Sequence, residues 1–256
     1  GNDAYVFKFF NPPKSNSNWV NIYVKTPKES MCVHHSTYKD VPPEWLGRDF
    51  IEEAEHLREV NPDAYEHEYM GVANGNGGMV FDYLELREIT DDEIARMDRI
   101  YQGVDWGWFP DPYAFIRSYY NPAQEKIYLI AENVVKKTKN TQTGQWIIDH
   151  GYDDYEIVCD SAEKKSVGDY VDIGLPARPA IKGPGSVEYG MKWLQGKTIV
   201  IDQARTPHAY KEFTEYEYER DKDGNVISGY PDADNHTIDA VRYSYEPLWR
   251  RSEHKA

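Results

Sequence analysis

Three aspartates and a histidine stand in sequence contexts that suit the binding of divalent cations. Asp105 lies in Gly-Val-Asp-Trp-Gly, Asp160 follows the apolar run Ile-Val-Cys, and His236 and Asp239 are one helical turn apart near the end of the chain. Carboxylates that converge from separate elements bind hard cations such as Mg²⁺ or Mn²⁺ and leave positions open for water and phosphate. Two such ions about 4 Å apart activate a water and stabilise the leaving 3′ oxygen in phosphodiester cleavage. The pattern therefore indicates metal-dependent nuclease chemistry, with His236 as a ligand, a water-orienting group or a proton donor.

Each of these four residues also has an ordinary structural explanation. An aspartate before Trp-Gly, such as Asp105, is often a turn residue, and the same applies to Asp160 before Ser-Ala. His236 would cap its helix or hydrogen-bond to the preceding hairpin, and Asp239 would pair with Arg242 three residues later. The joint occurrence of two strand-end acids and an acid on the last helix favours the functional interpretation.

Two predicted strands position the first two acids. Asp105 lies on a predicted strand over Ile100–Trp106, where Gly103 and Gly107 share its face because side chains alternate along a strand. We expect these glycines to leave room for a bulky substrate beside the carboxylate. Asp160 ends a second predicted strand, and an acid there lowers stability unless it is solvated, paired or bound to a cation.

A closing helix, predicted from Asn235 to about Pro247, carries the other two residues. A rotation of about 100° per residue places His236 and Asp239 on one side of this helix and the apolar Ile238 and Val241 on the other. We expect one side to pack on a sheet and the other to present the acid and the imidazole.

The order of elements in the second part of the chain predicts the architecture. Three strands joined by tight turns form an antiparallel meander, and a helix, a strand, further helices and the closing helix follow. This order is typical of a ribonuclease H-like α/β fold, a mixed sheet flanked by helices. The predicted strands are Ile100–Trp106, Tyr113–Tyr120, Lys126–Glu132, Glu156–Asp160, Ala177–Ile181 and Thr198–Ile201, the helices are Thr141–His150, Ser186–Gln195 and Pro207–Phe213, and a hairpin has arms at Tyr216–Arg220 and Asn225–Ser228.

The first part of the chain does not fit this order. Its residue types predict strands at Ala4–Phe10, Trp19–Lys25 and Met31–Ser36, and helices at Arg48–Val60 and Pro62–Tyr69. The glycine-rich run that follows lacks the Gly-Lys-Ser/Thr ending of a phosphate-binding loop and is predicted to be a flexible linker. A capping box at Thr90-Asp-Asp-Glu opens a short helix and marks a change of character. We therefore expect two domains, residues 1–90 and 91–256.

The bulk composition limits the classes of partner. A formal net charge of -15 over 256 residues argues against general affinity for nucleic acid or anionic membranes, although a local DNA groove is compatible with it. No segment approaches about 18 uninterrupted apolar residues and no signal-peptide pattern begins the chain, so we expect a soluble, cytoplasmic protein. Cys32 and Cys159 do not form a disulfide framework, and we expect Cys159 to be a buried thiol.

On these residues, the chain resembles the C-terminal nuclease domain of the large terminase subunit of tailed bacteriophages, the DNA-packaging motor. The resemblance covers about Asp98 to Trp249 and is specific in the combination of its motifs. These motifs are Gly103-Val-Asp-Trp-Gly107, Val158-Cys-Asp-Ser-Ala162, Ile181-Lys-Gly-Pro-Gly-Ser186, the hairpin Tyr216–Tyr230 and Asn235-His-Thr-Ile-Asp-Ala-Val-Arg-Tyr243.

The first part is similar to the tail of the ATPase domain of the same proteins and to the linker that follows it. The matching pieces are Phe7-Lys-Phe-Phe-Asn-Pro-Pro13 and His35-Ser-Thr-Tyr-Lys-Asp40. No Gly-x-x-x-x-Gly-Lys-Ser/Thr motif occurs in the 256 residues. We therefore expect no ATP site, and no ATP hydrolysis, in this fragment of the motor.

The resemblance also implies roles for individual residues. Asp105, Asp160 and Asp239 would bind two Mg²⁺ or Mn²⁺ ions, with His236 as an accessory ligand. Many members of the wider nuclease superfamily have a further central glutamate, for which Glu132 is the candidate unless it only faces solvent. Lysines near the strand ends would contact the DNA backbone or be ordinary solvated side chains, and they are Lys136, Lys137, Lys139, Lys164, Lys165 and Lys182.

The implied function is an endonuclease domain that cuts concatemeric double-stranded viral DNA with little sequence readout. Its implied partners are double-stranded DNA and, in the full-length protein, the ATPase domain, the small terminase subunit and the portal, in the host cytoplasm and without a membrane. Two alternatives stay open. Another ribonuclease H-like enzyme, such as a recombinase or resolvase, would prefer branched or hybrid substrates, whereas a non-catalytic module that docks the motor onto a portal would bind no divalent ion.

Overall fold

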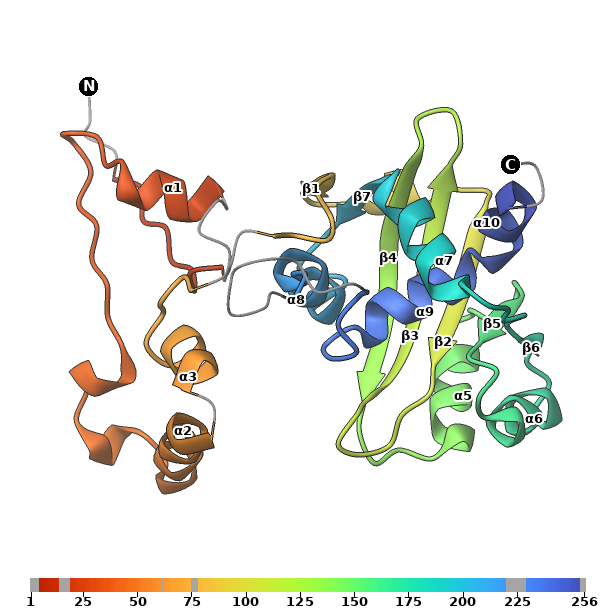
Figure 1. Cartoon of the computed structure of the whole chain (residues 1–256), viewed down its shortest axis with the longest axis horizontal. Coiled ribbons are helices and arrows are strands. Elements are labelled where there is room, and N and C mark those ends of the chain that lie inside the picture. Colours follow the sequence, from red (N-terminus) through yellow and green to blue (C-terminus); the bar gives the residue numbers. More distant parts are fainter. Residues whose placement is uncertain (1–4, 14–18, 61, 75–77, 220–228, 254–256) are drawn as a thin grey trace. The chain divides into compact units, whose positions relative to one another are not determined.

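The chain divides into two compact units in the computed structural model (Figure 1), residues 1–79 and residues 80–256. The structure describes residues 5–13, 19–60, 62–74, 78–219 and 229–253. Within these ranges no helix has both the length and the apolar character needed to cross a membrane.

The first unit consists of helices joined by extended segments. Its elements are α1 (Trp19–Lys25), α2 (Arg48–Val60), α3 (Pro62–Glu68) and the 3₁₀ turns η1 (Tyr38–Asp40) and η2 (Pro43–Trp45). The two predicted helices are confirmed. The three predicted strands are wrong, because Trp19–Lys25 is helical and residues 5–10 and 31–36 form no strand. Apolar and β-branched residues favour a strand only where a sheet supplies pairing partners, and no strand lies among the described residues of this unit.

A seven-stranded mixed sheet, in the order β1-β7-β4-β3-β2-β5-β6, forms the centre of the second unit. Strands β2, β3 and β4 make the predicted antiparallel meander, and parallel strands extend it on both sides. The mixed sheet is therefore confirmed. Its strands are β1 (Leu84–Leu86), β2 (Ile100–Asp105), β3 (Tyr113–Asn121), β4 (Lys126–Val135), β5 (Ile157–Cys159), β6 (Ala177–Pro179) and β7 (Thr198–Ile201).

Helices cover both faces of this sheet (Figure 1). Side chains alternate along β3, so Ala114 and Ile116 pack in one core with residues of α7 to α10, while Tyr113 and Phe115 pack in a second core with residues of α5 and α6. The buried Cys159 lies in the second core, as predicted. The helices are α4 (Asp91–Ile94), α5 (Asn140–Asp149), α6 (Lys164–Asp172), α7 (Ser186–Gln195), α8 (Pro207–Glu215), α9 (His236–Ser244) and α10 (Glu246–Glu253).

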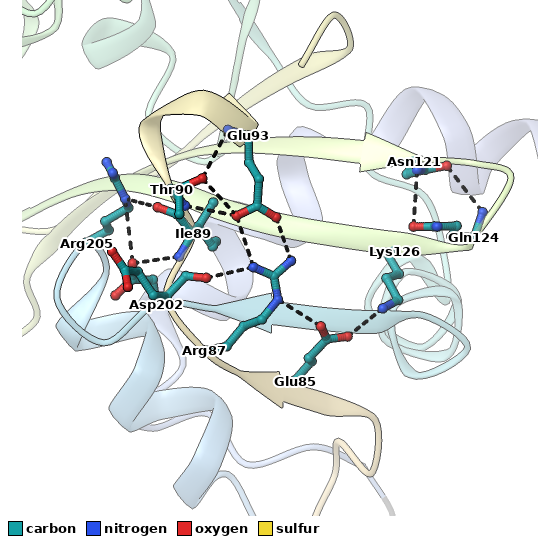
Figure 2. A network of polar contacts seen from close by, with 11 residues as sticks. Glu85, Arg87, Ile89, Thr90, Glu93, Asn121, Gln124, Lys126, Asp202 and Arg205 are labelled. Carbon is teal, nitrogen blue, oxygen red and sulfur yellow. Dashed lines mark hydrogen bonds and ion pairs between the residues drawn. The ribbon is translucent and has the colours of Figure 1, made fainter. Parts of the chain in front are cut away.

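Figure 2 shows a polar network that anchors the first residues of the second unit. Arg87, after β1, donates to both carboxylate oxygens of Glu93 (2.9 and 3.1 Å), and Thr90 completes the predicted capping box with Glu93. Asp202, after β7, accepts a hydrogen bond from Ile89 N (2.9 Å). Residues 80–90, which the sequence analysis assigned to the first domain, thus pack with the second unit, because the short strand β1 joins its sheet.

Two predictions near the C-terminal end have a different outcome. The closing helix is interrupted at Tyr245, between α9 and α10, because Pro247 has no N–H with which to continue the hydrogen bonds of α9. The turn and second arm of the predicted hairpin fall on residues 220–228, outside the described residues.

Candidate active site

The ends of two neighbouring parallel strands bring Asp105 and Asp160 side by side. Val104 of β2 lies opposite Cys159 of β5, so the two aspartates occupy equivalent positions one residue further along. Asp160 N donates a hydrogen bond to Val104 O (2.8 Å), and the indole N–H of Trp106 donates to Asp160 O (3.1 Å). These bonds fix the backbone of both acids beyond the last paired residues.

A glycine lets α9 approach β2 closely. A Cβ atom on Gly103 would lie 1.9 Å from Ala240 O, so the helix backbone fills the space that a side chain would take. A Cβ atom on Gly107 would lie 2.1 Å from Pro112 O. The predicted room for a substrate beside Asp105 is therefore wrong, since both glycines contact protein backbone. The absence of a side chain at Gly103 instead allows α9, which carries His236 and Asp239, to pack directly on β2.

Helix α9 is packed on nearly every side. All its residues are buried except His236 and Asp239, which are half-buried. The predicted division into one packed side and one open side is wrong, because α7, α8 and α10 contact α9 in addition to the sheet. The helix thus presents only its two chemically active side chains.

A glutamate of α8 caps the N-terminus of α9. Glu212 Oε2 accepts hydrogen bonds from Thr237 N (2.7 Å), Thr237 Oγ1 (2.5 Å) and Ile238 N (3.3 Å). The first N–H groups of a helix have no partner within it, so this carboxylate satisfies them from outside. Burial raises the pKa of Glu212, and the same three bonds oppose that rise. No local signal predicted this residue, because the cap comes from 25 residues earlier in the chain.

His236 connects Asp105 to the loop after β2. Its Nδ1 lies 3.0 Å from Asp105 Oδ2 and its Nε2 lies 3.7 Å from Asp111 Oδ1. The hydrogen bond with Asp105 raises the pKa of His236. Burial raises the pKa of Asp105 to about 6, His236 opposes this rise, and the negative charges of Asp239 and Asp160 add to it. The contact of Gly103 with Ala240, next to Asp239, and the influence of the charges of Asp239 and Asp160 on Asp105 indicate that the three carboxylates lie near one another.

Each carboxylate has a charged or polar side chain as a partner on one oxygen, and the same oxygen of Asp160 also accepts a hydrogen bond from Ala162 N (3.0 Å). His236 contacts Asp105, Lys182 Nζ contacts Asp160 Oδ1, and Arg242 Nε lies 3.0 Å from Asp239 Oδ1. The structural explanation of Asp239, an ion pair with Arg242, is therefore present in the molecule. The second oxygen of each of the three carboxylates accepts no hydrogen bond from the described residues. One oxygen of each acid is thus free to bind something else.

These free oxygens fit a divalent cation by their chemistry. Carboxylate oxygens are the ligands that Mg²⁺ and Mn²⁺ prefer, and the pKa of Asp105 is raised first by burial and further by the negative charges of Asp239 and Asp160. Across the described part of the chain, no three histidine, cysteine, aspartate or glutamate side chains are grouped closely enough to hold a metal as they stand. The carboxylates would therefore have to turn towards a cation when it binds.

Glu132, the candidate for a further central glutamate, makes its hydrogen bonds with the start of α8. Its carboxylate accepts hydrogen bonds from His208 N (2.9 Å) and Ala209 N (3.0 Å) and lies 2.7 Å from His208 Nδ1. The side chain is only 5% exposed, so it does not face solvent either. Glu132 caps the N-terminus of α8.

The six lysines near the strand ends fall into three places. Only Lys182 contacts a site acid. The others are exposed, with Lys136, Lys137 and Lys139 between β4 and α5, and Lys164 and Lys165 in the first turn of α6.

A family model described as Terminase RNAseH like domain matches residues 105–246, which is more than half of the chain and includes all four site residues. The chain belongs to this terminase family. A second model, described as Phage terminase large subunit, matches residues 2–72. The ribonuclease H-like fold and the family predicted from the sequence are confirmed.

Relatives of this terminase chain are themselves large terminases. It is 41% identical over 250 residues to the terminase large subunit of Bacillus phage SPP1, a match that covers 94% of this chain and 59% of that protein. It is 27% identical over 218 residues to the PBSX phage terminase large subunit of Bacillus subtilis (strain 168), covering 83% and 50%. The chain therefore spans between half and about three fifths of the length of these relatives.

A solved structure of a large-terminase domain also matches this chain. The nuclease domain of the large terminase of bacteriophage SPP1, crystallised with bound Mn, superimposes with a TM-score of 0.62 at 41% identity, over 65% of this chain and 97% of that one.

Proposed function

We propose that the second unit is a divalent-metal-dependent endonuclease domain. The observation that carries this proposal is the convergence of Asp105, Asp160 and Asp239 with His236 at one end of the sheet, with one oxygen of each acid free. The SPP1 relative, at 41% identity, is a nuclease domain with bound Mn, which supports the same chemistry here.

The four residues would act as follows. Asp105, Asp160 and Asp239 would hold Mg²⁺ or Mn²⁺, as two ions, with His236 as an accessory ligand. When bound, such ions supply an activated water and stabilise the leaving 3′ oxygen. Glu212, by capping α9, fixes the position of His236. The hydrogen bond with Asp105 raises the pKa of His236, which favours the alternative role of this imidazole, as a proton donor to the leaving oxygen in place of a metal ligand.

The substrate that we propose is concatemeric double-stranded viral DNA, cut at the start and end of capsid filling. In the full-length protein the partners would be the ATPase domain, the small terminase subunit and the portal, in the host cytoplasm. The match of residues 2–72 to the large-subunit model supports this assignment. The first unit would then be the end of the ATPase domain together with the linker that follows it.

A plasmid-nicking assay in Mn²⁺ tests the proposal. Asp105→Ala, Asp160→Ala and Asp239→Ala should each lower cutting by more than about 100-fold, because changes in the outer shell of a metal site alone cost about 10- to 100-fold. Asp92→Ala, which removes an exposed acid of α4, is the matched control and should cut like the wild type. Circular dichroism checks that each variant is folded, and full activity in all three site variants would end the proposal.

Calorimetric titration with Mn²⁺ distinguishes the alternatives. A folded wild-type protein that binds no divalent ion would be a non-catalytic module that docks the motor onto a portal. A protein that binds the ion but cuts branched or hybrid substrates in preference to plasmid would be a recombinase or resolvase.

A further inference from the structure

Two large aromatic side chains project from the loop between β2 and β3, next to the candidate active site. Trp108 is 54% exposed and Phe109 is 60% exposed. Apolar rings of this size are usually buried, and neighbouring exposed ones indicate a binding surface. They follow Asp105 by three and four residues, and Asp111 of the same loop lies 3.7 Å from His236 Nε2. The loop that carries the two rings therefore borders the site.

The backbone of this loop is held in place at several points. The backbone of Gly107 is in close contact with Pro112 O, the indole of Trp106 binds Asp160 O, and Trp108 O accepts a hydrogen bond from Lys137 N (2.9 Å). The two rings are thus exposed on a loop whose backbone is already ordered. Ligand binding would therefore cost little further conformational entropy in this loop.

Lysines accompany the rings. Lys136, Lys137 and Lys139 are exposed in the loop between β4 and α5, which leaves the sheet at the same end as the loop between β2 and β3 (Figure 1). Lys137 Nζ lies 4.4 Å from the ring centroid of Phe109. No carboxylate of the described residues is within ion-pairing distance of any of the three. In a chain with net charge -15, such a local excess of positive charge favours a polyanion.

The rings and the lysines suit the two chemical parts of an unstacked nucleic-acid strand, its bases and its phosphates. Aromatic side chains stack on base faces, and lysines contact the phosphates on either side. Base faces are accessible only where a base has left the duplex stack, so a perfect duplex could use the lysines but not the rings.

We propose that Trp108 and Phe109, with Lys136, Lys137 and Lys139, form an aromatic ledge that stacks on bases unpaired from the duplex beside the cleavage point. This proposal rests on the proposed nuclease function and adds to it a preference for locally opened DNA. The lysines hold the adjoining phosphates, and the rings hold the displaced bases.

Binding of labelled DNA without metal tests the ledge separately from cleavage. Fluorescence anisotropy in EDTA compares a perfect duplex with the same duplex containing a short unpaired bubble. The wild type should bind the bubble more tightly, and the double variant Trp108→Ala/Phe109→Ala should lose about tenfold for the bubble and little for the duplex, as base stacking on aromatic rings predicts. Loss of the bubble preference with duplex binding intact is the result that identifies stacking.

Two control variants make the outcome specific. Tyr83→Ala removes an aromatic side chain that is 63% exposed next to β1, at the far edge of the sheet, and should change neither affinity. Replacing Lys136, Lys137 and Lys139 by Ala should weaken binding to both substrates alike and lower the salt dependence by about one counterion per lysine.

Each remaining outcome overturns the ledge. A wild type without bubble preference, a ring variant that binds both substrates like the wild type, or a ring variant that weakens both equally would each exclude base stacking. The proposed nuclease function fails on a different result, the absence of Mn²⁺-dependent cutting by the wild type, and that result leaves the binding comparison intact.

Discussion

Carboxylates in the network of Figure 2 are saturated with donors, whereas those at the ends of β2 and β5 are not. Glu93 accepts two hydrogen bonds from Arg87 and one from Thr90 N, and these interactions hold the pKa of Glu93 at about 2. Asp105 has one partner, His236, and burial beside two further acids raises its pKa to about 6.

The difference shows that the same fold gives opposite pKa shifts to carboxylates of the polar network and to Asp105 of the candidate active site. In the network, local donors make the ionised carboxylate the preferred form. At the candidate active site, burial and two neighbouring acids disfavour the ionised form of Asp105, and under the proposed function a bound cation would offset this effect. Substitutions that change the acids of the candidate active site but not those of the network, or the reverse, test this difference.

The largest effect should come from Gly103→Ala, which separates the site acids without touching the network. A Cβ atom 1.9 Å from Ala240 O meets rigid backbone, so we expect a loss of stability of at least about 4 kcal/mol. The matched control is Gly168→Ala in α6, where a Cβ atom would meet nothing within 4 Å and should stabilise by about 0.5–1 kcal/mol. Urea unfolding measures both, and a Gly103→Ala protein as stable as the wild type would show that α9 can move away from β2.

The pH dependence of stability should change in opposite directions in Asp105→Asn and Glu93→Gln. The pKa of Asp105, 3.8 ordinarily and about 6 when folded, means that ionisation destabilises the wild type as pH rises from about 4 to about 6, by at most about 3 kcal/mol. Asp105→Asn should abolish this fall. The pKa of Glu93 is lowered from 4.5 to about 2, so its contribution is present above about pH 4.5 and is lost as pH falls towards 2, and Glu93→Gln should lack it at neutral pH.

Thermal melting of both variants between pH 3 and pH 8 checks these slopes. Curves that run parallel to the wild type in both variants would remove the distinction between the two groups of acids.

A smaller effect is expected on metal affinity from Lys182→Met. The ammonium group beside Asp160 Oδ1 repels a divalent ion, so its removal should tighten Mn²⁺ binding by about tenfold, or about 1.4 kcal/mol. Lys126→Met, which removes the lysine partner of Glu85 in the network, is the control and should leave Mn²⁺ affinity unchanged. Calorimetry measures both, and weaker binding in Lys182→Met would instead make this lysine part of the support for the metal site.

The smallest effect should come from Glu132→Gln. Because Glu132 caps α8 through two N–H groups and His208, the amide should lower stability by about 1 kcal/mol and leave Mn²⁺-dependent cutting unchanged. A loss of cutting comparable to that of Asp160→Ala would return Glu132 to the catalytic group.

Local patterns predicted the meander, the acids at strand ends and the Thr90 capping box, because each depends on residues close in sequence. The Glu212 cap and the contact between Gly103 and Ala240 were not predictable, since each joins elements far apart in the chain. The helix at Trp19–Lys25 was mistaken for a strand because residue type alone does not reveal whether a sheet is available.

The burial of α9 has a mechanical consequence for control of the proposed nuclease site. A helix enclosed by a sheet and three other helices cannot slide or rotate by a small amount, since close-packed interiors resist gradual deformation. Switching this site off by withdrawing His236 and Asp239 would require unpacking the domain. Under the proposed function, control of DNA entry to a centre that stays assembled would need less structural change than withdrawal of these two side chains.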